Sequence, residues 1–366
     1  MTDRVFIIAE AGVNHNGSVD MALEMIDVAA SAGADAVKFQ TAVPEEVISK
    51  QAPKAMYQKV TTGDGGSQLE MVRALHFVDG IAVHRRLAER AAGRSIMFMS
   101  TPFDRPSLQM LVRDIGLRKI KISSGDVTNG PLLLAAAHAD CDVILSTGMA
   151  TLSEIESALG VLAFGYLHAE NPPSLDACLT AYLDVRGQEV VRRRVTLLHC
   201  VTAYPAPFNE MNLRAIDTLA HEFKTRVGFS DHSIGAAMSI AAVARGASVV
   251  EKHFTLDRRL PGPDHAASLE PWELSSLIAD IRAIEQGLGS GVKEPQVCEL
   301  ENIGVARRSL VARHALRRGE EFSEENIAAK RPAGGVSPMR YWELMGTNAS
   351  QDYDADEAIS ELSDKR

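Results

Sequence analysis

Short apolar segments rich in β-branched residues alternate with longer amphipathic segments along most of the sequence. The short segments predict strands and the long ones predict helices, because apolar positions recur with different periods in the two structures. One helix is expected to begin after the N-cap residue Ser18 and to end at Gly33. The predicted strands span residues 5–12, 35–41, 95–101, 118–124, 142–148, 195–200, 226–231 and 248–254.

The order of these segments indicates the fold. Alternation of strands and helices predicts parallel pairing, and eight repeats are the number that closes a (β/α)8 TIM barrel. A doubly wound open sheet is the alternative, but it would favour a G-x-G-x-x-G turn after the first strand. The sequence at that position is AEAGVNHNG, which does not match, so we predict an α/β barrel over residues 1–290.

Three further segments lie outside this alternation. Residues 42–80 and 169–194 lack an obvious period and are interpreted as loops, the first lying over the active-site end of the barrel. Residues 291–304 are typical of a linker, and residues 305–366 predict a small β-rich domain.

Composition narrows the class of protein. Hydrophobic residues make up 46% of the chain, the mean hydropathy is −0.04, and no stretch approaches the ~18 apolar residues of a membrane span. No secretory signal is evident and the four scattered cysteines form no C-x-x-C pair, so we expect reduced thiols and a cytoplasmic location. A net charge of −10 makes nucleic acid an unfavourable partner, so an anionic substrate must be held by a local cluster of cations.

Polar residues gather where the predicted strands end, which is where the catalytic residues of such barrels lie. Burying so much charge is costly unless the groups are paired or bind a ligand. The residues concerned are Glu10, Asn14, His15, Asn16, Lys38, Gln40, Ser100, Thr101, Lys121, Ser123, Ser124, Asp126, Ser146, Thr147, His199, Ser230, Asp231, His232, Glu251 and His253.

Two lysines stand out in this set. Lys38 and Lys121 alternate with apolar neighbours, so their ammonium groups should point into the barrel and could hold a phosphate and a carboxylate. In the alternative interpretation each lysine only neutralises Glu10 or Glu251. The hydroxyl groups expected beside them are those of Ser146, Thr147 and Ser230.

Two histidines and two carboxylates complete the candidate chemistry. His232 and His253 end adjacent strands, so their imidazoles can converge, and two imidazoles beside carboxylates suit Mn²⁺ or Zn²⁺. Their spacing matches no metal motif, and a structural role for both is the alternative. Glu10 and Asp126 are candidates for the general acid or base, with pKa values set by burial and by the lysines.

The sequence resembles the sialic acid synthase family in nine segments that occur in the same order. These are IIAEAGVNHNG, DAVKFQT, STPFD, KISSGDVTNGPLL, ILSTGMATL, LLHC, GFSDHS, VVEKHFTLDR and PGPDH. The later segments RRSLVA, AAKRPAGGVSP and LMG are similar to the antifreeze-like (SAF) domain of that family, so the resemblance spans nearly the whole chain.

The resemblance implies a transferase that condenses phosphoenolpyruvate with an N-acetylated mannose-type sugar, giving a nine-carbon keto acid and phosphate. It implies a divalent metal, Mn²⁺ ahead of Mg²⁺ or Co²⁺, bound by His232 and His253. It also implies a domain-swapped homodimer in which each small domain covers the barrel mouth of the other chain. Phosphoenolpyruvate would be held by Lys38, Thr101, Lys121, Ser124, Ser146 and Ser230. The sugar would be addressed by Glu10, Gln40, Tyr204 and Asp264, and from the other chain by Arg331.

Two positions depart from the family pattern. Asp126 stands where the family often has glutamate, which keeps a carboxylate but shortens it by one methylene. Thr202, in the segment VTAYP, stands where the family usually has asparagine, so an amide donor is replaced by a hydroxyl.

Residues 54–75 are similar to the version found in bacterial legionaminic acid synthases of this family, which take 2,4-diacetamido-2,4,6-trideoxymannose. An apolar wall from this segment would suit the 6-methyl group, so we predict that this sugar is preferred over N-acetylmannosamine. The residues expected at the mouth are Met56, Tyr57, Leu69 and Met71. The alternatives are a sialic acid or pseudaminic acid synthase, a synthase of an eight-carbon acid, and a carbohydrate- or ice-binding protein.

Overall fold

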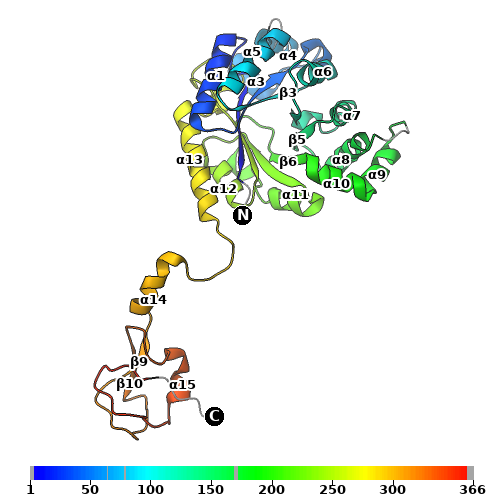
Figure 1. Cartoon of the computed structure of the whole chain (residues 1–366). Coiled ribbons are helices and arrows are strands. Elements are labelled where there is room, and N and C mark those ends of the chain that lie inside the picture. The colour runs from blue at the N-terminus through cyan, green and yellow to red at the C-terminus, as the bar shows by residue number, and fades with distance from the viewer. Residues whose placement is uncertain (1–3, 64, 78–79, 169–171, 361–366) are drawn as a thin grey trace. The chain divides into compact units, whose positions relative to one another are not determined.

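All eight predicted strands form in the computed structural model, and they pair in parallel in the order β3-β2-β1-β8-β7-β6-β5-β4 (Figure 1). Strands β3 and β4, at the two ends of this order, lie against each other, so the sheet curves into the predicted TIM barrel. The structure describes residues 4–63, 65–77, 80–168 and 172–360. The strands are β1 (Phe6–Gly12), β2 (Ala36–Thr41), β3 (Met97–Pro102), β4 (Lys119–Ile122), β5 (Asp142–Ser146), β6 (Val195–Cys200), β7 (Arg226–Asp231) and β8 (Val249–His253).

Helices surround the barrel strands. The predicted caps of the first helix are confirmed: the Ser18 hydroxyl accepts a hydrogen bond from the Met21 N–H at 3.2 Å, and Gly33 ends the helix with a φ of 87°. The first α-helices after strands other than β2 are α1 (Val19–Ala32), α6 (Arg105–Arg113), α7 (Gly130–His138), α8 (Leu152–Tyr166), α11 (Ala215–Phe223), α12 (Ala237–Ala244) and α13 (Pro271–Gly287).

The two segments expected to be loops contain further helices, so that expectation is wrong. The segment after β2 forms α2 (Pro44–Val47), α3 (Met56–Thr62) and α4 (Gln68–Leu75) before α5 (Gly80–Gly93). The segment before β6 forms α9 (Leu175–Leu183) and α10 (Val185–Arg194). Helices this short hold too few apolar positions to establish a period, which is why the pattern did not reveal them.

One level of the barrel interior is apolar. Its residues are Ile8, Ala36, Met99, Ile144, Leu198 and Val249, which come from six strands. Because side chains alternate between the two faces of a strand, the residue two positions later faces the interior again. Those residues are Glu10, Lys38, Thr101, Ser146, Cys200 and Glu251. The apolar level therefore supports a polar level at the C-terminal ends of the strands.

The chain divides into two compact units, Met1–Ser290 and Gly291–Arg366. Near the start of the second unit lies α14 (Leu300–Ala306), a helix without buried residues. Strands β9 (Ser309–Ala312) and β10 (Ile327–Lys330) pair antiparallel, and α15 (Tyr341–Leu344) follows. The core of this unit consists of Leu310, Ala312, Leu316, Phe322, Ile327, Val336, Leu344, Ala349, Tyr353 and Ile359.

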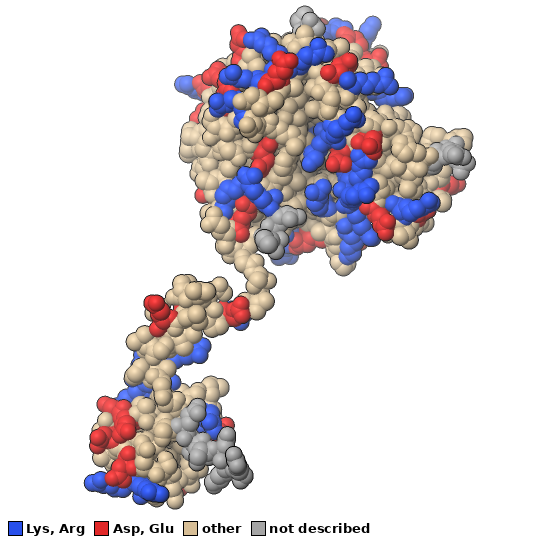
Figure 2. Space-filling view, in the orientation of Figure 1, with Lys and Arg blue, Asp and Glu red and all other residues tan. Residues whose placement is uncertain are grey.

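The surface and the cysteines agree with the composition. On the barrel face shown in Figure 2, lysine and arginine side chains lie among acidic ones. Within the described part of the chain, no helix is both long enough and apolar enough to cross a membrane. All four cysteines are free thiols, and three of them are buried.

Candidate active site

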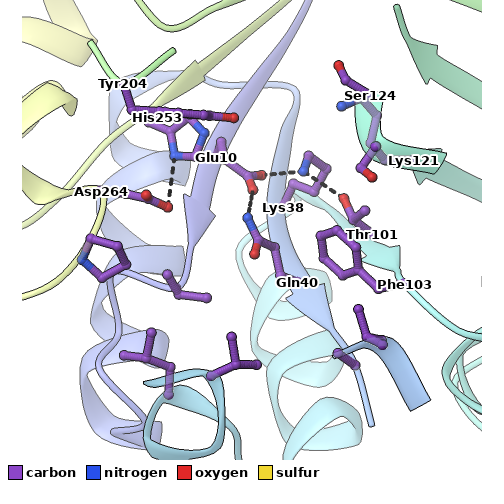
Figure 3. Close-up of a pocket in the computed structure, with 18 of the residues that line it drawn as sticks. Glu10, Lys38, Gln40, Thr101, Phe103, Lys121, Ser124, Tyr204, His253 and Asp264 are labelled. Carbon is purple, nitrogen blue, oxygen red and sulfur yellow. Dashed lines mark hydrogen bonds and ion pairs between the residues drawn. The ribbon is translucent and has the colours of Figure 1, made fainter. Parts of the chain in front are cut away.

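A pocket with a volume of about 440 Å³ opens at the C-terminal ends of the barrel strands (Figure 3). It brings together twelve of the fourteen site residues that the sequence and the family resemblance indicated. These twelve are Glu10, Lys38, Gln40, Thr101, Lys121, Ser124, Ser146, Tyr204, Ser230, His232, His253 and Asp264.

Four charged residues, Glu10, Lys38, Lys121 and Glu251, form what we call the lysine–carboxylate floor of this pocket. Strand register places Glu10 opposite Lys38, and their charged groups lie 2.6 Å apart. The ammonium group of Lys121 lies 3.0 Å from Glu251 Oε1, and Glu251 Oε2 lies 3.7 Å from Lys38. All four residues are at most 4% exposed, so their charges are held within the protein. The lysines therefore do pair with the carboxylates, and they still face the pocket.

Hydroxyl groups extend the floor. The ammonium group of Lys38 donates to Thr101 Oγ1 at 2.9 Å, and Ser230 Oγ donates to Glu251 at 2.8 Å. The buried hydroxyl of Ser146 has no hydrogen-bond partner among the described residues. An unpartnered hydroxyl beside a buried lysine is an available donor for an oxyanion.

The floor carboxylates differ in pKa. Burial raises the pKa of Glu10 to about 7, against the attraction of Lys38. Burial also opposes the charge of Glu251, but Lys121 and Lys38 outweigh it and hold the pKa of that carboxyl well below its ordinary value. Glu251 is therefore the permanent anion of the floor, and Glu10 is the group able to exchange a proton near neutral pH.

The opposite part of the pocket, His232, His253 and Asp264, is called here the histidine side. The two imidazole rings lie with their centroids 5.5 Å apart, and the Tyr204 ring lies 4.1 Å from that of His232. The Nδ1–H of His232 donates to the Val201 carbonyl at 2.8 Å, which leaves the lone pair on Nε2. The buried Nδ1 of His253 has no hydrogen-bond partner in the described part of the chain and lies 4.0 Å from Asp264 (Figure 3).

The pKa values of the three residues on the histidine side are shifted in different directions. Burial, then the charges of His232 and Lys38, lower the pKa of His253 well below its ordinary value, so this ring is neutral. Burial opposes protonation of His232 as well, but Cys200, 3.6 Å from Nδ1, outweighs it and raises the pKa of His232. Burial raises the pKa of Asp264 to about 6. A histidine binds a metal only when it is deprotonated, so the neutral His253 ring meets this requirement, whereas a metal at His232 would have to displace a proton.

The histidine side fits a divalent ion with open coordination positions. Among the described residues, no group of three or more His, Cys, Asp or Glu side chains is arranged to hold a metal. The unpartnered Nδ1 of His253 and the Nε2 lone pair of His232 are nevertheless donors of the kind that divalent transition metals accept. Two protein ligands leave positions for substrate atoms, as an open catalytic site requires.

Two predicted site residues lie outside the pocket lining. Asp126 ends the short 3₁₀ turn Ser124–Asp126, where its carboxylate accepts hydrogen bonds from Ser123 at 2.5 Å and from the Asn129 amide at 3.0 Å. Asp126 therefore braces the turn after β4, which argues against a role as the general acid or base. Arg331 is an exposed residue of the second unit.

The segment between β2 and β3 supplies an apolar wall, defined as Val47, Ile48, Met71, Val72, Leu75 and Phe77. Of the residues predicted at the mouth, Met71 lines the pocket. Leu69 is 4% exposed and packs away from the lining, whereas Met56 is 74% exposed and also lies outside it. The side chain of Tyr57 lies outside what the structure describes.

Comparison with known proteins shows which family this chain belongs to. A model of the NeuB family matches residues 25–293, and a model of the SAF domain matches residues 307–361. The chain belongs to the NeuB family. The resemblance drawn from the sequence motifs is therefore confirmed.

Relatives of this NeuB chain include two bacterial proteins named N,N'-diacetyllegionaminic acid synthase. The one from Campylobacter jejuni is 46% identical over 98% of this chain and 99% of its own length. The one from Legionella pneumophila is 40% identical over 96% of this chain and 92% of its own length. A solved structure of a sialic acid synthetase from Leptospira borgpetersenii, in complex with citrate, superimposes with a TM-score of 0.67 and 38% identity, covering 82% of this chain and 91% of that one.

Two residues that line the pocket of this NeuB chain, Thr202 and Cys200, were not among the fourteen assigned to the site. Thr202 and Ser124 come so close to Gly148 that a Cβ there would lie 2.2 Å and 2.8 Å from their hydroxyl oxygens, so only glycine fits. Cys200 lines the pocket one residue after the predicted strand-end histidine His199, whose own Nε2 is bonded to the Met211 carbonyl at 2.7 Å. Strand alternation was the signal that could have separated the two, since it turns Cys200 inward and His199 outward.

Proposed function

We propose that the protein is a phosphoenolpyruvate-dependent nonulosonic acid synthase that makes N,N'-diacetyllegionaminic acid from 2,4-diacetamido-2,4,6-trideoxymannose. The observation that carries this proposal is one pocket that combines a floor of buried lysines with two converging imidazoles. The relatives named N,N'-diacetyllegionaminic acid synthase support the choice of product.

Phosphoenolpyruvate would occupy the floor. Its phosphate and carboxylate would be held by Lys38 and Lys121, with donors from the hydroxyl groups beside them. The unpartnered Ser146 hydroxyl supports this placement, because a buried donor normally has a partner. Thr101, Ser124 and Ser230 carry the remaining hydroxyl groups, and Ser230 would have to release its bond to Glu251 in order to donate to phosphoenolpyruvate.

The amino sugar would lie between the histidine side and the apolar wall. A divalent ion, Mn²⁺ in this proposal, would be held by His232 and His253 and would supply Lewis-acid polarisation of the open-chain aldehyde. Gln40, Tyr204 and Asp264 would bind the polar groups of the sugar. Glu10 lies within reach of both substrates and would exchange a proton, since its pKa is about 7.

The reaction order follows from the substrates. The C3 carbon of phosphoenolpyruvate forms a bond to the aldehyde carbon as the carbonyl π bond breaks, so the aldehyde oxygen takes up a proton and C2 is left with positive character. Water adds at C2 and gives up a proton, and the bond between C2 and the bridging oxygen then breaks, so that this oxygen leaves in phosphate. The paired lysines would hold the phosphate charge throughout, because their positions are already fixed by the floor carboxylates.

One experiment tests both the reaction and the substrate. Phosphoenolpyruvate labelled with ¹⁸O in the bridging position should transfer its label to phosphate when Mn²⁺ and the diacetamido sugar are present. The value of kcat/KM should be higher for that sugar than for N-acetylmannosamine. A higher value for N-acetylmannosamine would instead make the protein a sialic acid synthase, and label retained in the keto acid would contradict the C–O cleavage.

The alternatives are less well supported. An eight-carbon-acid synthase acting on a phosphorylated sugar would need a second phosphate site, whereas the sugar end of this pocket is lined by the apolar wall. A carbohydrate- or ice-binding protein would leave the lysine–carboxylate floor without a purpose. A pseudaminic acid synthase differs only in the stereochemistry of its sugar, so the same assay with that sugar separates the two.

We also propose a cytoplasmic, domain-swapped homodimer in which Arg331 acts on the barrel of the other chain. Exposed apolar side chains in the second unit support an interface, among them Leu300 of α14, at 54%, and Trp342 of α15, at 78%. Mixing an Arg331→Ala chain with a His253→Ala chain should regenerate activity through hybrid dimers. A mixture no more active than its separate components would exclude this arrangement.

A further inference from the structure

The loop that carries Asp264 lies between two cavities. Pro263 and Asp264 line the main pocket, while Pro261, Gly262 and Pro263 also line a second cavity of about 570 Å³. Pro263, Asp264 and His265 are buried, but the cavities remove packing contacts from two sides of residues 261–263. Other contacts must hold the loop.

The first of these contacts comes from Asn14, in the NHNG segment after β1. Its side-chain amide donates to the Phe254 carbonyl at 2.8 Å and to Ser268 Oγ at 2.9 Å. The Ser268 hydroxyl in turn donates to the backbone carbonyl of Asp264 at 2.7 Å. Asn14 is 1% exposed, so these bonds form away from water and hold the backbone of Asp264 directly.

The second contact joins Asn16 to His265. The Asn16 amide nitrogen donates to the Pro261 carbonyl at 2.9 Å, so its Oδ1 faces His265 Nε2 at 3.3 Å. Because Oδ1 can only accept, Nε2 carries the proton. Nδ1 then accepts from the Thr255 hydroxyl at 2.7 Å, a shorter distance than the 3.1 Å from that hydroxyl to its alternative acceptor, the Asp257 carbonyl. A neutral His265 can thus donate to Asn16 and accept from Thr255 at the same time.

The fit around His265 extends to the backbone. Gly262 has a φ of 152°, and a Cβ there would lie 2.7 Å from the His265 ring and 3.0 Å from Asn16 Oδ1. The PGP turn therefore closes against the Asn16–His265 pair with no room for a side chain.

Asp264 itself is left available. The residue is 7% exposed, yet among the described residues no donor is hydrogen-bonded to its carboxylate, and its nearest ionic neighbour is His253 Nδ1 at 4.0 Å. A buried carboxylate whose backbone is held but whose oxygens are free is arranged to bind something that arrives later.

We propose that Asn14, Asn16 and His265 form a clasp that positions the Asp264 carboxylate for the amino sugar. The clasp residues act through Asp264 and do not touch the sugar, so they are positioning residues. This inference rests on the proposed function, which assigns Asp264 to the sugar. It accounts for the polar NHNG segment, which the reaction itself does not use.

The test compares sugar binding in matched variants of the full chain. The probe is the alditol of 2,4-diacetamido-2,4,6-trideoxymannose, which lacks the reactive aldehyde, titrated calorimetrically with Mn²⁺ and phosphoenolpyruvate present. Asn16→Ala and His265→Asn should each weaken binding by about 10-fold or more, because outer partners that orient a ligating group usually contribute that much. The KM for phosphoenolpyruvate should not change, since the lysine–carboxylate floor is untouched.

Two further variants act as controls. His265→Gln should recover most of the affinity lost in His265→Asn, because a glutamine amide can reach the Nε2 position that faces Asn16 and an asparagine cannot. Arg259→Ala should bind the alditol as the wild type does, since it alters the same loop at a surface ion pair with Asp257. Equal losses for the glutamine and asparagine variants would overturn the clasp.

Asp264→Asn separates failure of the clasp from failure of the proposed function. If this variant binds weakly while Asn16→Ala binds normally, the clasp is wrong and the sugar role of Asp264 stands. If Asp264→Asn binds normally, the clasp and that role both fail, whereas label transfer to phosphate still reports on the reaction itself. A fall in melting temperature with unchanged alditol affinity would reduce the clasp to a purely structural feature.

Discussion

The lysine–carboxylate floor and the histidine side lie in one pocket but differ in whether their polar groups have partners within the protein. On the floor each ammonium group has an anionic partner within 3.0 Å, and all four residues are buried. On the histidine side the His253 Nδ1 has no hydrogen-bond partner within the described chain, and Asp264 lies 4.0 Å away. The charges of the floor are paired within the protein, whereas the nitrogen and carboxylate of the histidine side are left without such a pair.

Because of this difference, substitutions in the two parts of the pocket should affect different properties, stability for one and activity for the other. Removing one member of a buried ion pair leaves the other charge uncompensated, which costs about 3–5 kcal/mol. Removing a group that has no partner in the protein loses no such pairing. Floor variants should therefore lose free energy of unfolding, while variants of the histidine side should lose turnover with the fold retained.

The largest expected effect is on turnover in His253→Ala. Because His253 is one of the two proposed metal ligands, its loss should lower kcat/KM by more than the ~10–100-fold typical of outer-sphere changes. Phosphate release measures this loss, and Mn²⁺ affinity followed by electron paramagnetic resonance should fall with it. EDTA should silence the wild type, and added Mn²⁺ should restore it.

The same variant tests the comparison itself. His253→Ala should lose less unfolding free energy in urea than Lys121→Met. Full activity in EDTA would refute the metal site, and a stability loss as large as that of Lys121→Met would remove the distinction between the two parts of the pocket.

The next effect is on stability, in Lys121→Met. This change leaves the charge of Glu251 with Lys38 alone, 3.7 Å away, and should lower the free energy of unfolding by about 3–5 kcal/mol. Adding Glu251→Gln should restore part of the loss, because the uncompensated charge is then gone. A double variant less stable than Lys121→Met would show that the pair is not the cause.

A smaller effect concerns pH and Glu10. Burial raises its pKa from an ordinary 4.5 to about 7, so between these values the folded protein holds a proton that the unfolded chain has lost. The contribution of Glu10 to the free energy of unfolding is thus fully present below pH 4.5. It falls as the pH rises to 7, by at most about 1.4 kcal/mol per pH unit. Urea unfolding across this range should show a flatter decline in Glu10→Gln, and identical slopes would contradict the raised pKa.

Much of the fold and floor could be predicted because both follow strand periodicity. Lys38 lies two positions after the interior residue Ala36, and Lys121 lies between Ile120 and Ile122, which pack in the core outside the barrel, so alternation alone turns both lysines inward. The pairing of both lysines with carboxylates was also foreseen as an alternative. Parallel order then brings the ends of distant strands together without any further information.

Residues beyond the strand ends were harder to predict. Asp126 lies in a 3₁₀ turn, where no period fixes direction, and it hydrogen-bonds locally instead of facing the pocket. Met56 was expected at the mouth and is 74% exposed, because the helices of its segment were not recognised. Asn16 and His265 meet across 249 positions of sequence, a contact that no local pattern reveals.

The smallest predicted effect concerns the apolar wall, which neither the floor nor the histidine side supplies. Val72 of α4 lines the pocket, and Val72→Thr keeps its shape while adding a hydroxyl to the wall. An apolar surface favours the 6-methyl sugar over its 6-hydroxyl analogue only modestly, so the ratio of kcat/KM for the trideoxy sugar to that for N-acetylmannosamine should fall by about 10-fold.

Val60→Thr is the matched control, because Val60 lies on α3, is 79% exposed and is not part of the lining. The ratio in that control should equal the wild-type ratio. If Val72→Thr leaves the ratio unchanged while Val60→Thr behaves as expected, the 6-position of the sugar does not face α4, and the preference must arise elsewhere in the pocket.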